Sequence, residues 1–445
     1  MRAGVGGALA ALLLLAGAAG GTGREGAVHV FVAPTGSDAN ACTAGAPCAS
    51  LDRAYRVAKP GDTVELAGGT YASQTVGVDR TKLSLSPPCT LRAPARCVTF
   101  RPAAGATVVV DGDLIMYGSN AVFKGAKNPH AFRVARNVLS EAVPGAATSH
   151  DVTFENLDAA AFAIGPNHRI TIKGGDWGPN YICGSQGGVI ENKIEPSGQI
   201  LNQWPHDIVL DGLYIHDQNS ADLGRCHMGG LFVISGYNLV IRNSIFSKDV
   251  VYDVLVQDFS NPACCGMKFG QPRDVVIENN WFGAPVTGLQ DPGGDRTDDR
   301  QPDLQFDERF GAWKNFLVRY NSFHNSLDFA TAGGTPSFDN VRVVANVGDA
   351  PRCFRGAPGL TWGFNAWKAG VCDSSDVRLQ TLPYVSSQVG AENFHLRGGR
   401  AVNLIKTKTK TKKRKLLAKE LALSTDIDGQ RRPRGVGRDA GADER

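Results

Sequence analysis

The sequence predicts an all-β fold, a parallel β-helix that is closed at its start by a short capping helix. The prediction rests on two observations: a pair of short apolar strands recurs along the chain at variable spacing, and helical periodicity is nearly absent from these repeats. A unit of this size cannot bury its apolar face alone, whereas stacked units bury a continuous interior. The chain of 445 residues is therefore expected to form a solenoid.

The repeat is visible in the stretch GLFVISGYNLVIRNSIF at 230–246, which reads as two apolar strands joined by a Gly-containing turn. Copies of its second strand begin at residues 151, 169, 207, 238, 274, 315 and 340, and one other short apolar strand lies between neighbouring copies. The Asn or Gly after the strand provides the tight or left-handed backbone that a sharp corner needs. Each repeat is therefore expected to form one coil.

Side-chain alternation along the second strand predicts which residues face the interior. The second apolar residue of each copy is expected to point inward: Phe154, Ile172, Leu210, Ile241, Ile277 and Val318. The next residue then points outward, and its charge alternates in sign over six coils: Glu155, Lys173, Asp211, Arg242, Glu278 and Arg319. With parallel strands about 4.8 Å apart, we expect an ion-pair ladder. A charged track for a polymer is the alternative, which the cancelling signs disfavour.

The other strand of the repeat predicts a second face. Its inward residues are expected to be Val254, Val256, Leu304, Phe306, Leu327 and Phe329. Its polar residues are expected to point outward or to end the strand pointing outward: Asp253, Gln257, Gln305, Asp307, Arg309 and Asp328. The loops beside this strand are long, at 216–230, 260–274 and 283–303. Long polar loops beside one face of a solenoid build a groove, so we expect the functional site there.

The first 27 residues have the layout of a secretory signal peptide, with Arg2, an apolar run from about Val5 to Ala18, and then small residues. We therefore expect a secreted, extracellular protein. An even count of 10 Cys fits that compartment. Short separations predict three local disulfides: Cys42–Cys48, Cys89–Cys97 and Cys353–Cys372. Four further cysteines stay unassigned: Cys183, Cys226, Cys264 and Cys265. A zinc site using Cys226, His227 and His216 is a disfavoured alternative, because no CxxC pair is present.

After the signal peptide we expect a β-helix domain at 28–400, whose N-terminal cap covers about 28–75, and a C-terminal segment at 401–445. The stretch 406–420 holds eight basic residues and one acidic residue, whereas the whole chain has a net charge of only +4. Basicity is therefore local, and neither a nucleic-acid partner nor a membrane span is expected. We interpret 406–420 as a mobile, solvated insertion, with adhesion to anionic polymers as the alternative.

Three stretches resemble the right-handed parallel β-helix proteins, the pectate-lyase-like superfamily. The opening HVFVAPTGSDANACTAGAPCASLDRAYRVAKPGDTVELAGGTY is similar to the start of these proteins, in which an amphipathic helix, here about 51–58, caps the open end. The central coils match the general repeat. The close, STDIDGQRRPRGVGRDAGADE, resembles a terminal motif of many secreted bacterial members. The resemblance covers roughly 28–445 and implies the right-handed β-helix, a fold that hosts lyases, hydrolases, epimerases and non-catalytic proteins.

The resemblance implies a particular lyase chemistry. Such lyases cleave uronic-acid polymers by β-elimination, in which Ca²⁺ or an Arg neutralises the sugar carboxylate and a basic residue removes the α-proton. The stretch ERFGAWKNFLVRYNSF at 308–323 resembles the end of the pectate-lyase segment RxPxxR, with Arg309 at its second Arg and Leu304 in place of the first. Leu304 therefore stands where the pectate-lyase segment has its base, so this chain departs from the pectate-lyase mechanism at that position.

The candidate residues follow from these comparisons and from the expected groove. For catalysis we name Lys248, Arg309 and His227, of which His227 belongs to the dense polar cluster of His216, Asp217, Asp222 and Arg225. For substrate binding we name Gln257, Gln305, Lys268 and Arg225, and Lys268 is also an alternative base. For Ca²⁺ we name Asp253, Asp258, Asp307 and Asp328.

Two functions are compatible with these residues. The first is a Ca²⁺-assisted lyase that acts as a monomer on an acidic polysaccharide or cell-wall glycan. The second is a non-catalytic surface or matrix protein that binds glycans in the same groove. A hydrolase is disfavoured: DRTDDRQPD at 295–303 supplies carboxylates on a Gly-rich loop, but the GHG and RIK partners are missing.

Overall fold

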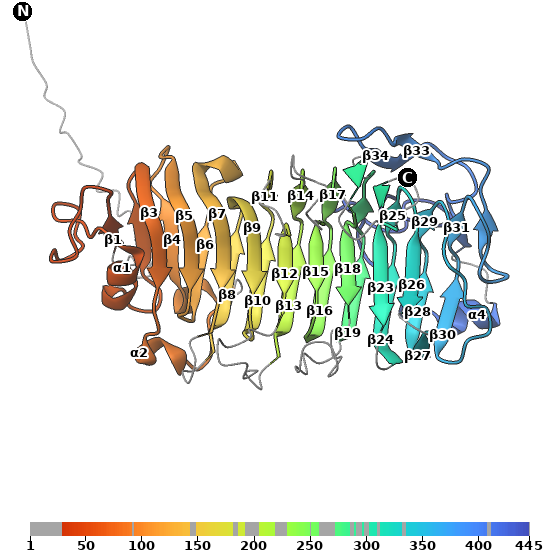
Figure 1. The fold of residues 1–445 in the computed structure, drawn as a ribbon, viewed down its shortest axis with the longest axis horizontal. Coiled ribbons are helices and arrows are strands. Elements are labelled where there is room, and N and C mark those ends of the chain that lie inside the picture. The colour runs from red at the N-terminus through yellow and green to blue at the C-terminus, as the bar shows by residue number, and fades with distance from the viewer. Residues whose placement is uncertain are drawn as a thin grey trace, which may run out of the picture.

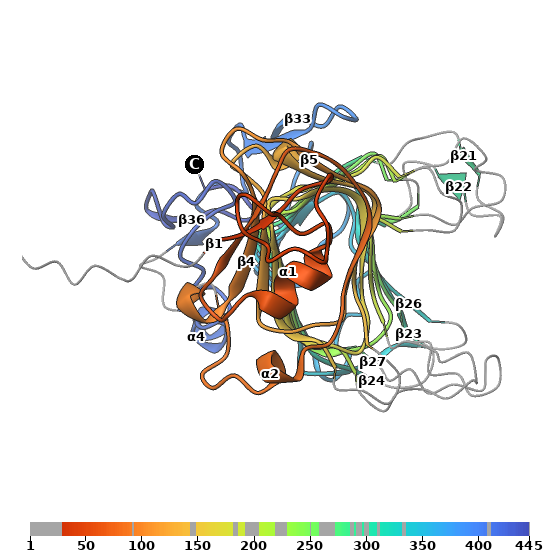
Figure 2. The same cartoon turned by 90° about the vertical axis from the view of Figure 1, so that its left-hand side faces the viewer.

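The computed structural model describes residues 29–90, 93–142, 148–180, 186–191, 204–218, 229–249, 251–257, 272–284, 289–290, 296–297, 302–308, 312–331, 335–406 and 411–444. The coils are stacked along one long axis (Figure 1), and α1 (Leu51–Val57) lies across the first coil (Figure 2). Parallel pairing between successive coils makes the chain an all-β, right-handed parallel β-helix with a short N-terminal capping helix, as predicted.

The first sheet runs the length of the molecule, and its strands are parallel neighbours in chain order. They are β1 (His29–Val32), β2 (Thr63–Leu66), β4 (Val98–Pro102), β6 (Ala121–Lys124), β8 (His150–Glu155), β10 (His168–Lys173), β13 (His206–Asp211), β16 (Tyr237–Arg242), β19 (Arg273–Glu278), β24 (Ala312–Arg319), β28 (Val341–Val344) and β30 (Leu360–Gly363), with β27 (Ser337–Asp339) beside β24. The predicted copies of the repeat are the strands from β8 to β28.

The rest of each coil begins as one long strand and divides further along the molecule. The undivided strands are β3 (Gly69–Val76), β5 (Val108–Met116), β7 (Phe132–Ser140) and β9 (Asp158–Ile164). The first part of β9 pairs with β11 and its last part with β12, so two rows of short strands continue from it.

The upper row in Figure 1 consists of β11 (Asp176–Trp177), β14 (Tyr214–His216), β17 (Ile245–Ser247), β20 (Trp281–Phe282), β25 (Ser322–Phe323), β29 (Val347–Gly348), β31 (Ala366–Trp367) and β32 (Val377–Arg378). The second row consists of β12 (Gly188–Ile190), β15 (Leu231–Val233), β18 (Val254–Gln257), β23 (Leu304–Glu308) and β26 (Leu327–Thr331). The division opens a corner between the rows at which the chain can leave the coil.

The remaining elements decorate the solenoid. Short helices are α2 (Arg80–Leu83), η1 (Pro94–Arg96), η2 (Pro129–Ala131) and α4 (Lys412–Leu416). Two-stranded antiparallel pairs are β21 (Leu289–Gln290) with β22 (Arg296–Thr297), β33 (Tyr384–Ser386) with β34 (Asn393–Leu396), and β35 (Ile405–Lys406) with β36 (Gly437–Arg438). In Figure 2, β21 and β22 project sideways from the coils, on the side on which β23 and β26 lie.

The capping helix forms because its first turn is capped and its apolar face has a partner. The Ser50 side chain accepts a hydrogen bond from the Arg53 backbone N–H at 3.1 Å, as expected of an N-cap. Leu51, Ala54 and Tyr55 are buried, and the Tyr55 hydroxyl donates to the Ser119 carbonyl at 2.6 Å. The helix therefore covers the apolar end of the first coil.

The predicted inward residues fill the interior. In the first sheet the six named residues, Phe154, Ile172, Leu210, Ile241, Ile277 and Val318, are at most 1% exposed. In β18, β23 and β26 the six named residues, Val254, Val256, Leu304, Phe306, Leu327 and Phe329, are 0% exposed. The period-2 pattern thus gave the correct register for both faces.

The corner after the first sheet uses left-handed backbone, as predicted. Asn156, Asn243 and Asn279 have φ between 53° and 61°, and Gly174 and Gly212 also have positive φ. One residue later, buried asparagines stack from coil to coil, and we call this row the asparagine corner: Asn280, Asn321, Asn346 and Asn365. Each side-chain oxygen accepts from the backbone N–H of the equivalent residue one coil earlier, at 2.9–3.1 Å for the three pairs.

The predicted charge ladder forms as three separate ion pairs. Lys173 contacts Glu155 at 3.2 Å, Arg242 contacts Asp211 at 2.8 Å, and Arg319 contacts Glu278 at 2.5 Å. Lys124 adds a second cation to Glu155 at 3.2 Å. Each pair joins residues on two adjacent strands, as expected if the strands are aligned in the predicted register.

Three disulfides are present as predicted: Cys42–Cys48, Cys89–Cys97 and Cys353–Cys372. Cys183, Cys226, Cys264 and Cys265 lie outside the described residues.

The C-terminal segment folds back onto the outside of the coils. Arg432 is 2% exposed, its guanidinium lies over the Tyr320 ring at 4.5 Å, and it donates to Glu444 at 3.0 Å and to Asn279 at 3.2 Å. The buried Arg is satisfied by a carboxylate, an amide and backbone carbonyls, as a buried charge requires.

The described part of the basic stretch corrects its interpretation as a mobile insertion. Leu417 is 1% exposed and Glu420 is 5% exposed. Glu420 pairs with Arg342, and its backbone carbonyl accepts from Arg319 at 2.7 Å. The stretch from α4 to 420 is therefore packed onto the solenoid, with its lysines on the outside.

Candidate functional site

The structure describes six of the eleven named site residues: Lys248, Asp253, Gln257, Gln305, Asp307 and Asp328. The other five lie outside the described residues: Arg225, His227, Asp258, Lys268 and Arg309. The six fall into three separate places, namely the outer face of the second row of strands, the interior corner between the rows, and the outer face of the upper row.

The outer face of β18, β23 and β26 brings four of them together, and we call these four residues with Arg352 the polar face. Gln257 donates from Nε2 to Asp307 Oδ2 at 2.6 Å across neighbouring strands. Gln305 and Asp328 occupy paired positions on the next two strands. Alternation places these side chains outside because Val256, Phe306 and Phe329 between them point inward.

Asp328 has the most unusual electrostatics of the polar face. Burial raises the pKa of its carboxyl, and the Arg352 guanidinium, 3.8 Å from Oδ2, opposes this increase. Its Oδ1 atom is buried and has no hydrogen-bond partner among the described residues. An unsatisfied carboxylate oxygen next to β23, the strand that carries the carboxylate of Asp307, can bind a cation or accept a hydrogen bond from a ligand hydroxyl.

The outward residues form a row that changes character along the solenoid. The strand register places Val189, Phe232, Leu255, Gln305 and Asp328 in line on five successive strands. The first three are apolar and the last two are polar. None of the outward residues in the described strands of this row is Lys or Arg, so a catalytic base would have to come from the neighbouring segments.

Asp253 does not join the polar face, which corrects the expectation that it points outward. It is 3% exposed and lies at the corner between the two rows of strands, where its charge acts on Asp249, which follows β17, and on Asp303, which directly precedes β23. We call these three residues the aspartate corner. The alternation rule fails at Asp253 because it precedes β18 and belongs to the corner, where the backbone no longer alternates.

The aspartate corner favours bound protons. Burial raises the pKa of all three carboxyls. The charge of Asp253 raises the pKa of Asp249 and Asp303 further, and that of Glu392 does the same for Asp253. A hydrogen bond between the two side chains raises the pKa of Asp249 and lowers that of Asp253, so Asp249 is the proton donor of the pair. The corner is therefore a structural feature of the interior and not a solvent-facing ligand set.

Lys248 lies on the upper row and is engaged in an ion pair. Its Nζ is 3.3 Å from Asp217 Oδ2, and its backbone has a φ of 57°. The sequence placed it among the bases of the groove, but it follows β17, whereas the polar face lies beyond the corner on β18 and its neighbours.

The neighbours of Lys248 form a continuous charged network that spacing along the sequence did not reveal. His216 contacts Asp217 through Nδ1 at 2.7 Å and Asp176 through Nε2 at 2.6 Å. Further along, His130 contacts Asp158 at 2.8 Å. Burial alone would lower the pKa of His216, but its hydrogen bonds to Asp176 and Asp217 raise it. Sequence reasoning singled out His216 and Asp217, and missed Asp176 because it belongs to the preceding coil.

The polar face fits part of the predicted calcium site. Asp307 and Asp328 supply carboxylates, and the amide oxygens of Gln257 and Gln305 are further hard ligands of the kind that Ca²⁺ takes. Asp253 is excluded by its position, and Asp258 lies outside the described residues. The described residues thus offer two carboxylates, fewer oxygen ligands than a complete all-protein Ca²⁺ site needs.

Of the comparisons with known proteins, the one with solved structures found similar chains. No protein-family model matches the chain, and no curated protein is significantly similar to it in sequence. Solved structures that it resembles include the pectate lyase Pel9A (13% identity over 94% of this chain and 98% of that chain, TM-score 0.36). They also include the mannuronan C-5 epimerase AlgE6 A-module of Azotobacter vinelandii (13%, 72% and 97%, TM-score 0.37) and a rhamnogalacturonan lyase (11%, 81% and 91%, TM-score 0.35).

Those likenesses are weak in both identity and TM-score, and the fold is established by the strand pairing described above. No helix in the described ranges is long and apolar enough to cross a bilayer.

Proposed function

We propose that the protein is a secreted, carbohydrate-active β-helix enzyme that binds an acidic polysaccharide across the polar face and cleaves it by Ca²⁺-assisted β-elimination. The observation that supports this proposal most is the juxtaposition of Gln257 with Asp307 and of Gln305 with Asp328 on one outer face. Amides and carboxylates that recur on neighbouring strands, with one guanidinium beside them, match the repeating hydroxyls and carboxylates of a uronic-acid chain.

Each group has a role in this proposal. Asp307 and Asp328 would hold the cation, which would neutralise the sugar carboxylate and so acidify the α-proton. Arg352, beside Asp328, would pair with a second sugar carboxylate. The base would be Arg309, which directly follows β23 in sequence, because Lys248 is paired with Asp217 on the upper row. The disulfides and the signal-like first 27 residues support secretion.

The test incubates the mature protein with a panel of uronic-acid polymers, with Ca²⁺ or with a chelator. We expect the ultraviolet absorbance of the unsaturated product to rise only with Ca²⁺. Asp328→Asn should abolish most of the rise, whereas Asp349→Asn, a matched change of another carboxylate in an ion pair with Lys368 at 2.9 Å, should leave it intact. Unchanged turnover in Asp328→Asn would remove the polar face from the reaction.

A second candidate function is glycan binding without turnover. It is favoured by the lack of Lys and Arg among the outward residues of the described strands, and by the ion pair that engages Lys248. In that case the absorbance stays flat for every polymer, while retention on a glycan column is still lost in Asp328→Asn. A basic stretch that contributes adhesion should be tested by charge-neutral substitution of exposed lysines such as Lys412 and Lys415, because deletion would remove buried Leu417.

A further inference from the structure

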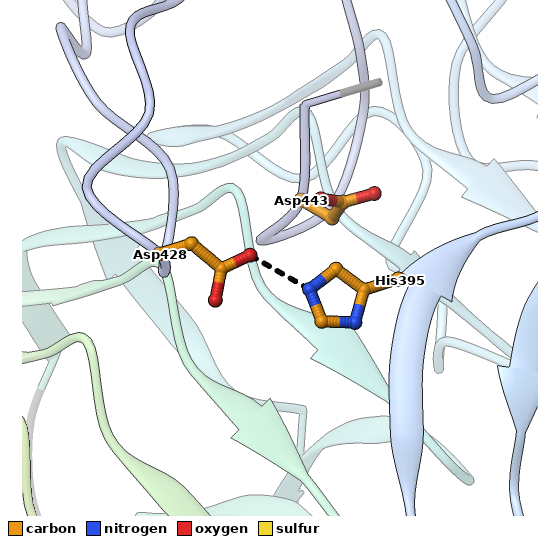
Figure 3. Close-up of side chains that lie close together, drawn as sticks. All are labelled: His395, Asp428 and Asp443. Carbon is orange, nitrogen blue, oxygen red and sulfur yellow. Dashed lines mark hydrogen bonds and ion pairs between the residues drawn. The ribbon is translucent and has the colours of Figure 1, made fainter.

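Three side chains far apart in sequence meet where the C-terminal segment packs on the upper row of strands. They are His395 on β34, Asp428 in the turn after Asp426, and Asp443 near the end of the chain (Figure 3). One ligand atom from each lies within 4.8 Å of the other two, and among the described residues this is the one group of three with that property.

The His395 ring is oriented as in a metal-binding histidine. The His395 backbone N–H donates to Asn393 Oδ1 at 3.2 Å, which identifies that atom as the amide oxygen. The ring nitrogen Nδ1 lies 2.5 Å from the same oxygen and must therefore donate a proton to it. Nε2 is left to face Asp428 Oδ2 at 2.7 Å, and a histidine whose second nitrogen is fixed by a carbonyl is the usual arrangement at metal centres.

Asp443 is fixed in position by the backbone. It is 4% exposed, and one of its oxygens accepts from the Leu396 backbone N–H at 2.8 Å. Its carboxylate also supplies one of the three ligand atoms of the group. A carboxylate that the backbone holds in place, within reach of an imidazole and a second carboxylate, is suited to share a cation with them.

We propose that His395, Asp428 and Asp443 bind one divalent transition-metal ion of the zinc type. One imidazole and two carboxylates suit such ions, whereas Ca²⁺ takes six to eight oxygens. Ligand bonds of about 2.1 Å in tetrahedral geometry put ligand atoms about 3.4 Å apart, so the 2.7 Å contact opens slightly and the wider separations close. His395 and Asp428 have side chains that are 36% and 38% exposed, which leaves the remaining coordination position to water.

The site ties together three segments, β34, the Asp426–Asp428 turn and the chain end, and so fixes the C-terminal segment in place. The Trp281 ring lies edge-on to the His395 ring with 5.0 Å between centroids. Trp281 therefore reports on the site, because a paramagnetic ion bound to Nε2 would quench its fluorescence. The proposal is independent of the lyase activity.

The experiment titrates tag-free, metal-stripped mature protein with Zn²⁺ by calorimetry and with Co²⁺ by fluorescence and visible absorption. We expect one ion per chain, Co²⁺ quenching that disappears in Trp281→Phe, and a Co²⁺ spectrum without thiolate bands. His395→Ala and Asp428→Asn should each weaken Zn²⁺ affinity by at least tenfold. His130→Ala, which removes an exposed histidine that contacts Asp158 at 2.8 Å, should bind as the parent does.

The two substituted side chains are partly exposed, and circular dichroism checks that the variants are folded. A parent protein that binds no Zn²⁺, a His395→Ala variant that binds as tightly as the parent, or a thiolate band in the Co²⁺ spectrum would each overturn the proposal.

Discussion

Two interior corners of the same solenoid solve the problem of buried polar groups in opposite ways. In the asparagine corner each amide both accepts and donates: Asn321 accepts from the Asn280 side chain at 3.0 Å and donates to Asn346 at 3.1 Å. In the aspartate corner, Asp249, Asp253 and Asp303 are acceptors when ionised and cannot satisfy one another. A stack of amides is therefore self-complementary at any pH, whereas a stack of carboxyls requires protons.

The largest expected effect breaks the asparagine corner. Asn321→Leu removes the side-chain hydrogen bonds to Asn280 and Asn346 on the two neighbouring coils and to the Ile277 carbonyl, and leaves buried groups unpaired. We expect the free energy of unfolding to fall by about 3 to 5 kcal/mol, measured by denaturant titration. Asn128→Ala, at an exposed asparagine that caps a short turn, is the control and should cost at most about 1 kcal/mol. An equal fall in the free energy of unfolding in the two variants would show that the asparagine corner stabilises the fold no more than an exposed cap does.

Removing a charge from the aspartate corner is expected to stabilise the fold, whereas the change in the asparagine corner destabilises it. Folding raises the pKa of the Asp253 carboxyl above its ordinary value of 3.8. The folded state is therefore most stable below pH 3.8, and it loses stability as the pH rises from 3.8 through the raised pKa, because the buried carboxyl must then ionise. Asp253→Asn supplies a permanently neutral group. We expect higher stability at pH 7, by about 1.4 kcal/mol for each unit of the shift, and a flatter dependence on pH. Asp339→Asn, whose side chain is 60% exposed, should change neither. A less stable Asp253→Asn variant at pH 7 would contradict the account.

A histidine stack on the outer face of the first sheet makes the fold more stable as the pH rises, whereas the aspartate corner makes it less stable. His168 lies between His150 and His206 with ring centroids 5.0 and 4.8 Å away, and burial, followed by the charge of Arg169, lowers its pKa to about 4. The unfolded chain takes up this proton near pH 6.5 and the folded chain does so only near pH 4, so acidification across this window destabilises the fold. We expect His168→Phe to flatten the stability profile in that window; an unchanged slope would place its origin elsewhere.

The smallest effect is expected at the surface ladder. Arg242 pairs with Asp211 at 2.8 Å, but its side chain is 41% exposed. Arg242→Ala should lower the free energy of unfolding by less than about 1 kcal/mol, and added salt should reduce the difference. A loss as large as that of Asn321→Leu would mean that the charged rows outside, and not the amides inside, hold the coils together.

The sequence predicted the fold well because each coil of a β-helix is determined by residues that are close in sequence. Alternation places Ile277 on the inner face and Glu278 on the outer face, and Asn279 forms the corner. It failed for Asp253, where a corner replaces the strand and alternation no longer applies. It also missed the cluster of His395, Asp428 and Asp443, because no spacing along a chain indicates that three such distant residues meet. Only the strand-borne part of the polar face, with Gln257, Gln305, Asp307 and Asp328, followed from periodicity.

The docked chain end has a consequence for how this protein can change in length. Arg432 contacts Asn279 and Tyr320, which belong to two consecutive coils, and Gly441 donates to Ala345 on the next coil at 2.7 Å. A duplication or loss of a whole coil before β19 would leave these three contact points in register. The same event between β19 and β28 would shift one contact point by a coil relative to the others. Evolutionary gain and loss of repeats should therefore be tolerated in the first half of the solenoid and suppressed in the second.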